Sequence, residues 1–233
     1  MARHRITSGR CLHLGCGDSR LEGWVNVDSV PYPAVDVIQD VTKEVPFTEC
    51  PYIFAEHFLE HLALPDATRF LGHCRKALAP EGVLRLTTPN LDWVWSTQYH
   101  PGAWSDHQEA VHDCLHLNRS FYGWGHKFLY NWQALEFLLR AAGFAEVVRC
   151  QRRCSTHSAL RDLERHETYP DEPALPHVLV VEASGLATPS DRLLMDSLRD
   201  YRRDTEMPFH QLQYAALSAA RLLTRAVRRK PVG

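Results

Sequence analysis

CLHLGCGDSRLEGWVNVD, which occupies residues 11–28, predicts the architecture of the chain. An apolar run at 11–14 is followed by a Gly-Cys-Gly turn at 15–17 and a short polar link, and a second apolar run at 24–27 ends on the carboxylate of Asp28. This order is typical of two parallel strands, with glycines where a ligand approaches bare backbone. An acid after the second strand lies beside the turn and can accept hydrogen bonds from a ribose diol. We therefore expect a ligand that contains adenosine to bind across the ends of these strands.

The turn differs from the glycine-rich loops that bind diphosphates. Arg20 stands where the dinucleotide motif needs a third glycine, and only six residues separate Gly17 from Trp24, too few for a full crossover helix. A pyrophosphate would therefore have no helix N-terminus to hold it. The chain also lacks the Gly-Lys-Ser/Thr sequence of triphosphate-binding loops. An adenosine ligand without a diphosphate, such as S-adenosylmethionine, fits this pattern.

Four motifs together resemble the class I S-adenosylmethionine-dependent methyltransferases, and more narrowly a bacterial branch with a truncated first crossover. The motifs are LHLGCG…GWVNVD at 12–28, QDV…VPF at 39–47, AEHFLEHL at 55–62 and GHK…AGF at 125–144. Members of that branch are often associated with surface-polysaccharide or secondary-metabolite pathways. The resemblance implies an α/β fold: a doubly wound, mostly parallel, Rossmann-like sheet of seven strands that ends in a hairpin. A C-terminal helical appendage is expected to follow it.

Apolar periodicity predicts the remaining elements. Strands are expected at 35–38, 52–55, 83–87, 147–150 and 178–181, and helices at 66–79 and 131–142. Asp66 is expected to cap the first helix, and Gly143 to end the second. The charged, proline-containing residues 151–176 are interpreted as an exposed connection.

The chain is predicted to form an S-adenosylmethionine-binding methyltransferase domain at 1–186 and a helical tail at 187–233. Within the domain, residues 88–127 contain four tryptophans and five histidines in a long segment with weak periodicity. We interpret this segment as a substrate lid whose aromatic faces stack on the acceptor; a satellite aromatic core is the alternative. In the tail, Ser190 is expected to cap a helix, and an apolar stripe at 209–227 leads into basic residues. Such a helix can contact an anionic membrane or a partner protein, or pack on its own domain.

The resemblance assigns roles to individual residues. Cofactor contacts are expected from Gly15, Cys16, Gly17, Asp28, Asp40, Val41 and Glu56. The two glycines admit the methionyl part, Asp28 holds the ribose hydroxyls, and Asp40 with Val41 meets the adenine. For Asp40, a solvated loop acid is the alternative. Glu56 is expected at the methyl end of the site.

Methyl transfer to a hydroxyl group requires positioning and a base that takes the proton. Histidine suits this role because its ordinary pKa is near neutrality, and His57 and His126 are the candidate catalytic residues. The run His57-x-x-Glu60-His61 also has the residue order of a metal-binding motif, and matching positions bind a divalent ion in some small-RNA methyltransferases. In methyltransferases generally the Glu-His pair is structural, so we expect no metal site.

Composition restricts the function further. The chain has 233 residues, 45% of them hydrophobic, and its net charge of −2 argues against nucleic acid as a partner. Seven scattered cysteines and a short polar N-terminus indicate a cytoplasmic protein.

The expected reaction is O-methylation of a sugar, a surface-polysaccharide precursor or a small secondary metabolite. The alternatives are methylation of RNA or protein, a non-catalytic cofactor-binding partner subunit, and transfer of another part of the same cofactor.

Overall fold

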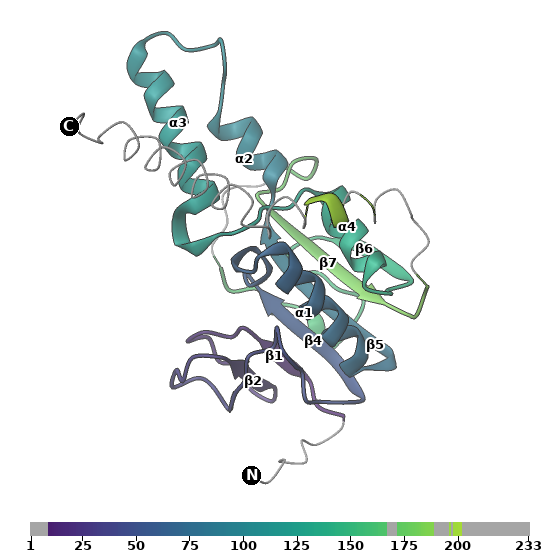
Figure 1. Cartoon of the computed structure of the whole chain (residues 1–233). Helices are drawn as coiled ribbons and strands as arrows, with labels where there is room; N and C mark the ends of the chain where they lie inside the picture. Colours follow the sequence, from purple (N-terminus) through teal and green to yellow (C-terminus); the bar gives the residue numbers. More distant parts are fainter. Residues whose placement is uncertain (1–8, 167–171, 189–195, 197, 202–233) are drawn as a thin grey trace, which may run out of the picture. The chain divides into compact units, whose positions relative to one another are not determined.

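Seven strands form one mixed sheet in the order β3-β2-β1-β4-β5-β7-β6 (Figure 1). The computed structural model describes residues 9–166, 172–188, 196 and 198–201. The strands are β1 (Leu12–Leu14), β2 (Val25–Asp28), β3 (Val37–Ile38), β4 (Cys50–Glu56), β5 (Leu78–Pro89), β6 (Glu146–Cys150) and β7 (Val178–Ser184). Strands β1 to β5 pair in parallel, whereas β7 runs antiparallel to both β5 and β6. The predicted Rossmann-like sheet with a terminal hairpin is therefore confirmed.

Helices cover the sheet and extend beyond it. The α-helices are α1 (Leu64–Ala77), α2 (Leu91–Gln98), α3 (His107–Tyr122) and α4 (Trp132–Ala141), and the short 3₁₀ turns are η1 (Leu59–His61), η2 (Gly123–Gly125) and η3 (Ser158–Leu160). Helices α1 and α4 contact each other, and they pack on β5 and β6 respectively. Helix α4 has its N-cap at Asn131, and Gly143 follows its end with a φ of +97°, as predicted.

Helix α1 begins earlier than predicted. Its N-cap is Ala63, whose side chain makes no capping bond, and Pro65 stands in the first turn. Proline suits that position because its fixed φ is already helical and its missing N–H needs no partner there. Asp66 therefore lies inside the first turn, where it pairs with Arg69, and its predicted capping role was wrong.

The crossover from β1 to β2 contains no helix. Asn26, on β2, is fully buried, and its side-chain amide forms hydrogen bonds with the backbone of this crossover. Its oxygen accepts from Leu21 N at 2.9 Å, and its nitrogen donates to Leu21 O and Trp24 O at 3.1 and 3.2 Å. The same nitrogen donates to Asp36 Oδ2 at 3.0 Å. One side chain thus satisfies several backbone groups that a crossover helix would otherwise bond.

The connection between β6 and β7 is partly buried, which corrects its interpretation as exposed. Leu160 and Leu163 are buried in a cluster with Leu21, Phe54 and Val83. Glu164 is one of the charged residues that led to the prediction of an exposed connection, and it is buried. This segment covers the face of β4 that carries Phe54, and it forms part of the core.

A buried ion triad fixes that connection to the sheet. Arg85 on β5 is fully buried, and its Nε donates to Glu164 Oε1 at 2.6 Å while its Nη1 donates to Glu182 Oε1 at 2.5 Å. Glu182 lies directly opposite Arg85 on β7. Because removal of one partner leaves buried charge without compensation, such a group is costly to break.

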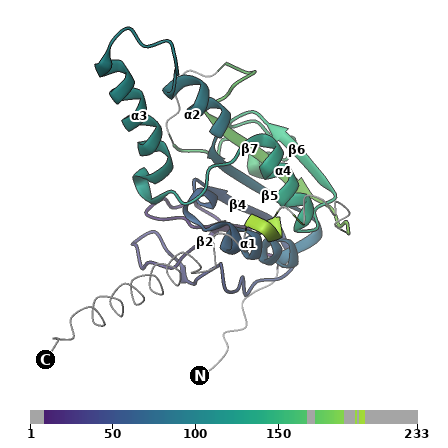
Figure 2. The same cartoon turned by 45° about the horizontal axis from the view of Figure 1, so that its top comes forward.

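The predicted lid at 88–127 is largely helical. Helices α2 and α3 form a hairpin that extends away from the sheet in both views (Figures 1 and 2). The base of the hairpin is closed because Leu91 N donates to Tyr130 O at 2.8 Å, beside a bridge between Asn90 and Tyr130. Most of α3 is exposed.

Residues up to Ser190 form one compact unit, and Asp191–Gly233 form a second. The second unit is described only at 196 and 198–201, where Arg199 pairs with Asp196. The predicted cap at Ser190 and the amphipathic stripe at 209–227 lie outside the described residues. Of the helices that are described, none combines the length and apolar character needed to cross a bilayer.

Replacement of Arg85 by Met tests the buried triad. We expect Arg85→Met to lower the free energy of unfolding by about 3–5 kcal/mol, because two buried carboxylates lose their counter-charge. Arg140→Met is the matched control, since Arg140 pairs with Glu136 in an exposed i,i+4 pair and should cost less than about 1 kcal/mol. Urea unfolding measures both changes. An equal loss in the two variants would show that the triad does not stabilise the fold.

Candidate active site

A cavity of about 690 Å³ opens where β1, β2 and β4 end. Its lining combines the glycine turn after β1, Asp28 at the end of β2, and Glu56 with His57 at the end of β4. The far wall comes from Trp124 and His126 at the end of the α2–α3 segment. Ligands of open α/β sheets bind at this edge, and the volume suits a small ligand.

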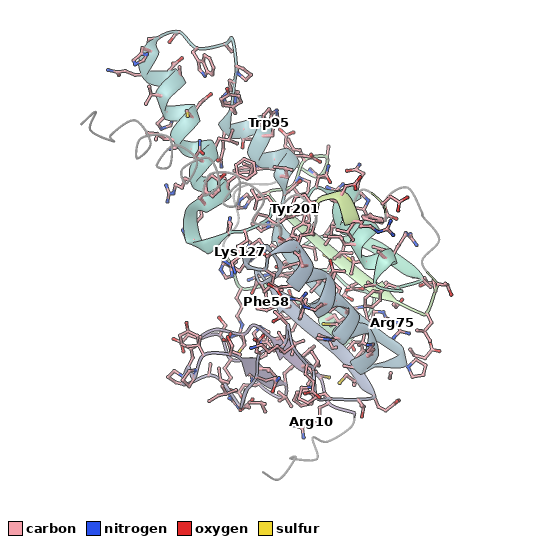
Figure 3. All side chains as sticks on the ribbon, viewed as in Figure 1. Arg10, Phe58, Arg75, Trp95, Lys127 and Tyr201 are labelled. Carbon is pink, nitrogen blue, oxygen red and sulfur yellow. The ribbon has the colours of Figure 1, made fainter. Side chains whose placement is uncertain are left out.

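The glycine turn has two different constraints. Gly15 and Gly17 have φ values of +64° and +54°, a region that favours glycine. A Cβ on Gly15 would overlap the ring of Phe58, which Figure 3 labels, whereas a Cβ on Gly17 would meet no atom within 4 Å. Gly15 is therefore needed for packing against Phe58, and Gly17 leaves open space for a ligand.

Asp28 is held in place by backbone donors. Its Oδ2 accepts from Gly17 N and its Oδ1 from Val30 N, both at 2.9 Å. A carboxylate has about four acceptor positions, so each oxygen can accept a further hydrogen bond from a ligand. Beside it, burial and the charge of Asp28 raise the pKa of Cys16 to about 11, so its thiol is neutral at physiological pH.

His13 lies at the floor of the cavity and is neutral. Burial lowers the pKa of this ring, and its Nδ1 lies 3.1 Å from Asn26 Oδ1. Because an amide oxygen only accepts, His13 Nδ1 carries the proton. The ring stacks on Phe54 with centroids 5.4 Å apart. His13 thus brings no charge to the floor of the site.

Asp40 and Val41 are not among the residues that line this cavity. Asp40 accepts from Thr42 N and Oγ1 and pairs with Lys43, and these contacts lower the pKa of its carboxyl group. Val41 is buried, and its carbonyl lies 3.2 Å from His73 Nδ1. Their contact with adenine stays a prediction.

Glu56 holds a segment that is distant in sequence. Its carboxylate accepts from Arg165 N at 2.9 and 3.1 Å and from His166 N at 3.0 Å. This contact brings the ring of His166 to 4.4 Å from that of His57, and His166 also lines the cavity. The sequence pattern did not indicate His166, because a separation of 110 residues leaves no local signal.

His57 is held by its backbone and by its side chain. Its φ of +47° is strained for a residue with a Cβ, and its N–H donates to Thr87 O at 3.1 Å. Its Nδ1 lies 3.0 Å from Oε1 of Glu60, a fully buried carboxylate whose Oε2 accepts from Thr88 Oγ1 at 3.1 Å. Since the carboxylate accepts, His57 Nδ1 carries the proton and Nε2 is the basic ring nitrogen.

His126 lies on the same wall. Its Nδ1 donates to Ser120 O at 2.8 Å, and its ring centroid is 5.2 Å from that of His61. Lys127, labelled in Figure 3, donates from its backbone N–H to Glu60 O at 2.7 Å, which joins this segment to η1. The structure thus brings both predicted catalytic histidines to one cavity.

Comparison with known proteins identifies a family. A family model described as a methyltransferase domain matches residues 1–149 of the 233. A search of curated proteins found no match.

Among solved structures, an S-adenosylmethionine-dependent methyltransferase from Archaeoglobus fulgidus shares 16% identity over 76% of this chain and 86% of its own, with a TM-score of 0.49. A DhpI–SAH complex shares 15% identity over 78% of both chains, with a TM-score of 0.45. The CMeT domain of the citrinin polyketide synthase shares 11% identity over 77% of this chain, with a TM-score of 0.45, and this chain spans 47% of its length. These distant likenesses concern the fold alone.

The family match covers more than half of the chain, including β1, β2, β4 and most of the cavity lining. The chain therefore belongs to the methyltransferase domain family, in agreement with the resemblance of its motifs to the class I S-adenosylmethionine-dependent methyltransferases.

Proposed function

We propose that this chain methylates a hydroxyl group of a small acceptor, such as a sugar, a surface-polysaccharide precursor or a secondary metabolite. The observation that carries the proposal is the His57–Glu60 pair on the wall of the cavity that contains the glycine turn. S-adenosylmethionine supplies a methyl group on a positively charged sulfur. The residues of the chain supply binding, orientation and a base.

The cavity fits this cofactor. Gly17 presents open backbone, and the fixed carboxylate of Asp28 retains acceptor capacity for a ribose diol. The neutral Cys16 and His13 bring no positive charge near a sulfonium. Gly17 and Asp28 would therefore hold the nucleoside part, and the wall with His57 would lie toward the methyl end.

His57 is suited to accept the proton of the acceptor. Glu60 fixes the tautomer that leaves Nε2 basic, and the buried carboxylate stabilises the imidazolium that forms when Nε2 takes the hydroxyl proton. The acceptor oxygen would then bond to the methyl carbon as the bond from that carbon to sulfur breaks, and S-adenosylhomocysteine would leave as the neutral product. His126 lines the same cavity, so it can help to position the acceptor.

The outer wall supports a small acceptor with a flat face. Trp124 lines the cavity and is 64% exposed as a residue, and the guanidinium of Arg119 lies 4.7 Å from the centroid of its ring. An exposed indole offers a stacking surface for a sugar or an aromatic ring. The net charge of −2 gives no attraction for nucleic acid, which favours a small molecule over RNA.

Replacement of Asp28 by Ala tests the cofactor site. We expect S-adenosylhomocysteine to bind more weakly by about 1–3 kcal/mol, because charge-assisted hydrogen bonds to the ribose are lost. Calorimetric titration measures the affinity, and Asp28→Asn, which keeps the shape, separates charge from local packing. Glu22→Ala is the control, since that side chain is 86% exposed in the same crossover. Unchanged affinity in Asp28→Ala would remove Asp28 from the site.

Replacement of His57 by Gln tests the base. We expect kcat for methyl transfer to fall by about 10²- to 10⁴-fold, with affinity for S-adenosylhomocysteine within about threefold of wild type. An acceptor screen with methyl-labelled cofactor identifies the substrate, and His116→Gln on the exposed part of α3 is the control. Wild-type turnover in His57→Gln contradicts this role. Cofactor binding without transfer to any acceptor would favour a non-catalytic subunit.

A further inference from the structure

We propose that Glu60, His61 and His126 form a binding site for a divalent transition-metal ion on the wall of the cavity. The sequence pattern combines His57, Glu60 and His61. In the structure, His57 is hydrogen-bonded to Glu60, and the third ligand is His126 instead of His57. The existence of the site stands on geometry alone. Only its role toward the acceptor rests on the proposed function.

The donor atoms are close enough to surround one ion. One ligand atom from each of the three residues lies within 4.8 Å of the others. Bonds of about 2.0–2.2 Å to a tetrahedral ion place neighbouring ligand atoms about 3.4 Å apart, so side-chain movements that bring these atoms together by up to about 1.4 Å complete the site. The rings of His61 and His126 meet edge to face at 61°, which lets two ring nitrogens converge from different directions.

The surrounding hydrogen bonds prepare these ligands. His126 donates from Nδ1 to Ser120 O, which leaves the lone pair of Nε2 available. Glu60 is bonded by Thr88 Oγ1 and by His57 Nδ1, yet each carboxylate oxygen keeps a second lone pair. Ligands of metal ions are usually oriented by such outer partners. The backbone bond from Lys127 N to Glu60 O holds the two ligand-bearing segments together.

The charge of Glu60 also favours a cation. Its side chain is fully buried, and burial of a carboxylate is costly without a positive partner. Across the described ranges, the ion pair recorded for this carboxylate is with His57, which carries charge only when its ring is protonated. A divalent ion would supply the missing positive charge.

The ligand types select the class of metal. Two imidazole nitrogens and one carboxylate oxygen suit zinc, cobalt, iron or manganese rather than magnesium or calcium. His61 and His126 line the cavity, so the remaining coordination positions face the space for the acceptor. An ion there would bind the acceptor oxygen and lower the pKa of its hydroxyl group.

Cobalt titration tests the site directly. The full-length chain is freed of metal with EDTA and titrated with Co²⁺, whose visible d–d absorption reports coordination. We expect one saturable equivalent that Zn²⁺ displaces. His61→Ala and His126→Ala should each weaken binding at least 100-fold, and Glu60→Gln at least tenfold. The control is the double variant His112→Ala/His116→Ala, which removes an exposed histidine pair with centroids 3.8 Å apart and should bind within twofold of wild type.

Three results would overturn the inference: no saturable cobalt absorption in the wild type, wild-type binding in the double variant His61→Ala/His126→Ala, or loss of binding in the His112/His116 control. Titration of the same samples with S-adenosylhomocysteine shows that each variant is folded. It also separates the two proposals. Cofactor binding and methyl transfer without cobalt binding would refute the metal site alone, whereas cobalt binding without methyl transfer would refute the proposed reaction alone.

Discussion

The buried amide of Asn26 is the interaction on which the cofactor end of the molecule depends. A crossover without a helix leaves backbone groups close to the core, and each one that stayed unpaired would cost about 1–3 kcal/mol. The amide bonds the N–H and carbonyl of Leu21 and the carbonyl of Trp24, and it meets Asp36 on the far side. Because the turn is fixed from inside, Gly17 and Asp28 face the cavity without support from a helix.

The opposite end of the cavity depends on two carboxylates near the end of β4. Glu56 accepts backbone hydrogen bonds from the connection before β7. The carboxylate of Glu60 is bonded by the side chains of His57 and Thr88, and its backbone carbonyl accepts from Lys127 N. Each acid therefore joins the end of one strand to a segment that is far away in the chain. The walls of the site come from distant parts of the sequence. Both are held by acids that lie only four positions apart, Glu56 and Glu60.

Local patterns were sufficient to predict much of this molecule. Glycine spacing predicted the turn, apolar runs predicted the strands, and the residues around α4 predicted its ends, whereas the assembly of the strands into one sheet was implied by the family resemblance. The partners that complete the site were not predictable, because a charged residue gives the same signal whether it is exposed or paired in the core. Glu164 pairs with Arg85 across 79 positions, and His126 contacts His61 of η1 although α2 and α3 lie between them in the chain.

The contact between Gly15 and Phe58 links two motifs that read as independent in the sequence. The aromatic ring occupies the volume that any side chain at position 15 would need. Because the same ring packs edge-on against Phe70 of α1, it has little freedom to move aside. The glycine turn and the start of η1 therefore constitute one packing unit: a side chain at position 15 would need both a smaller residue at position 58 and a left-handed backbone of its own.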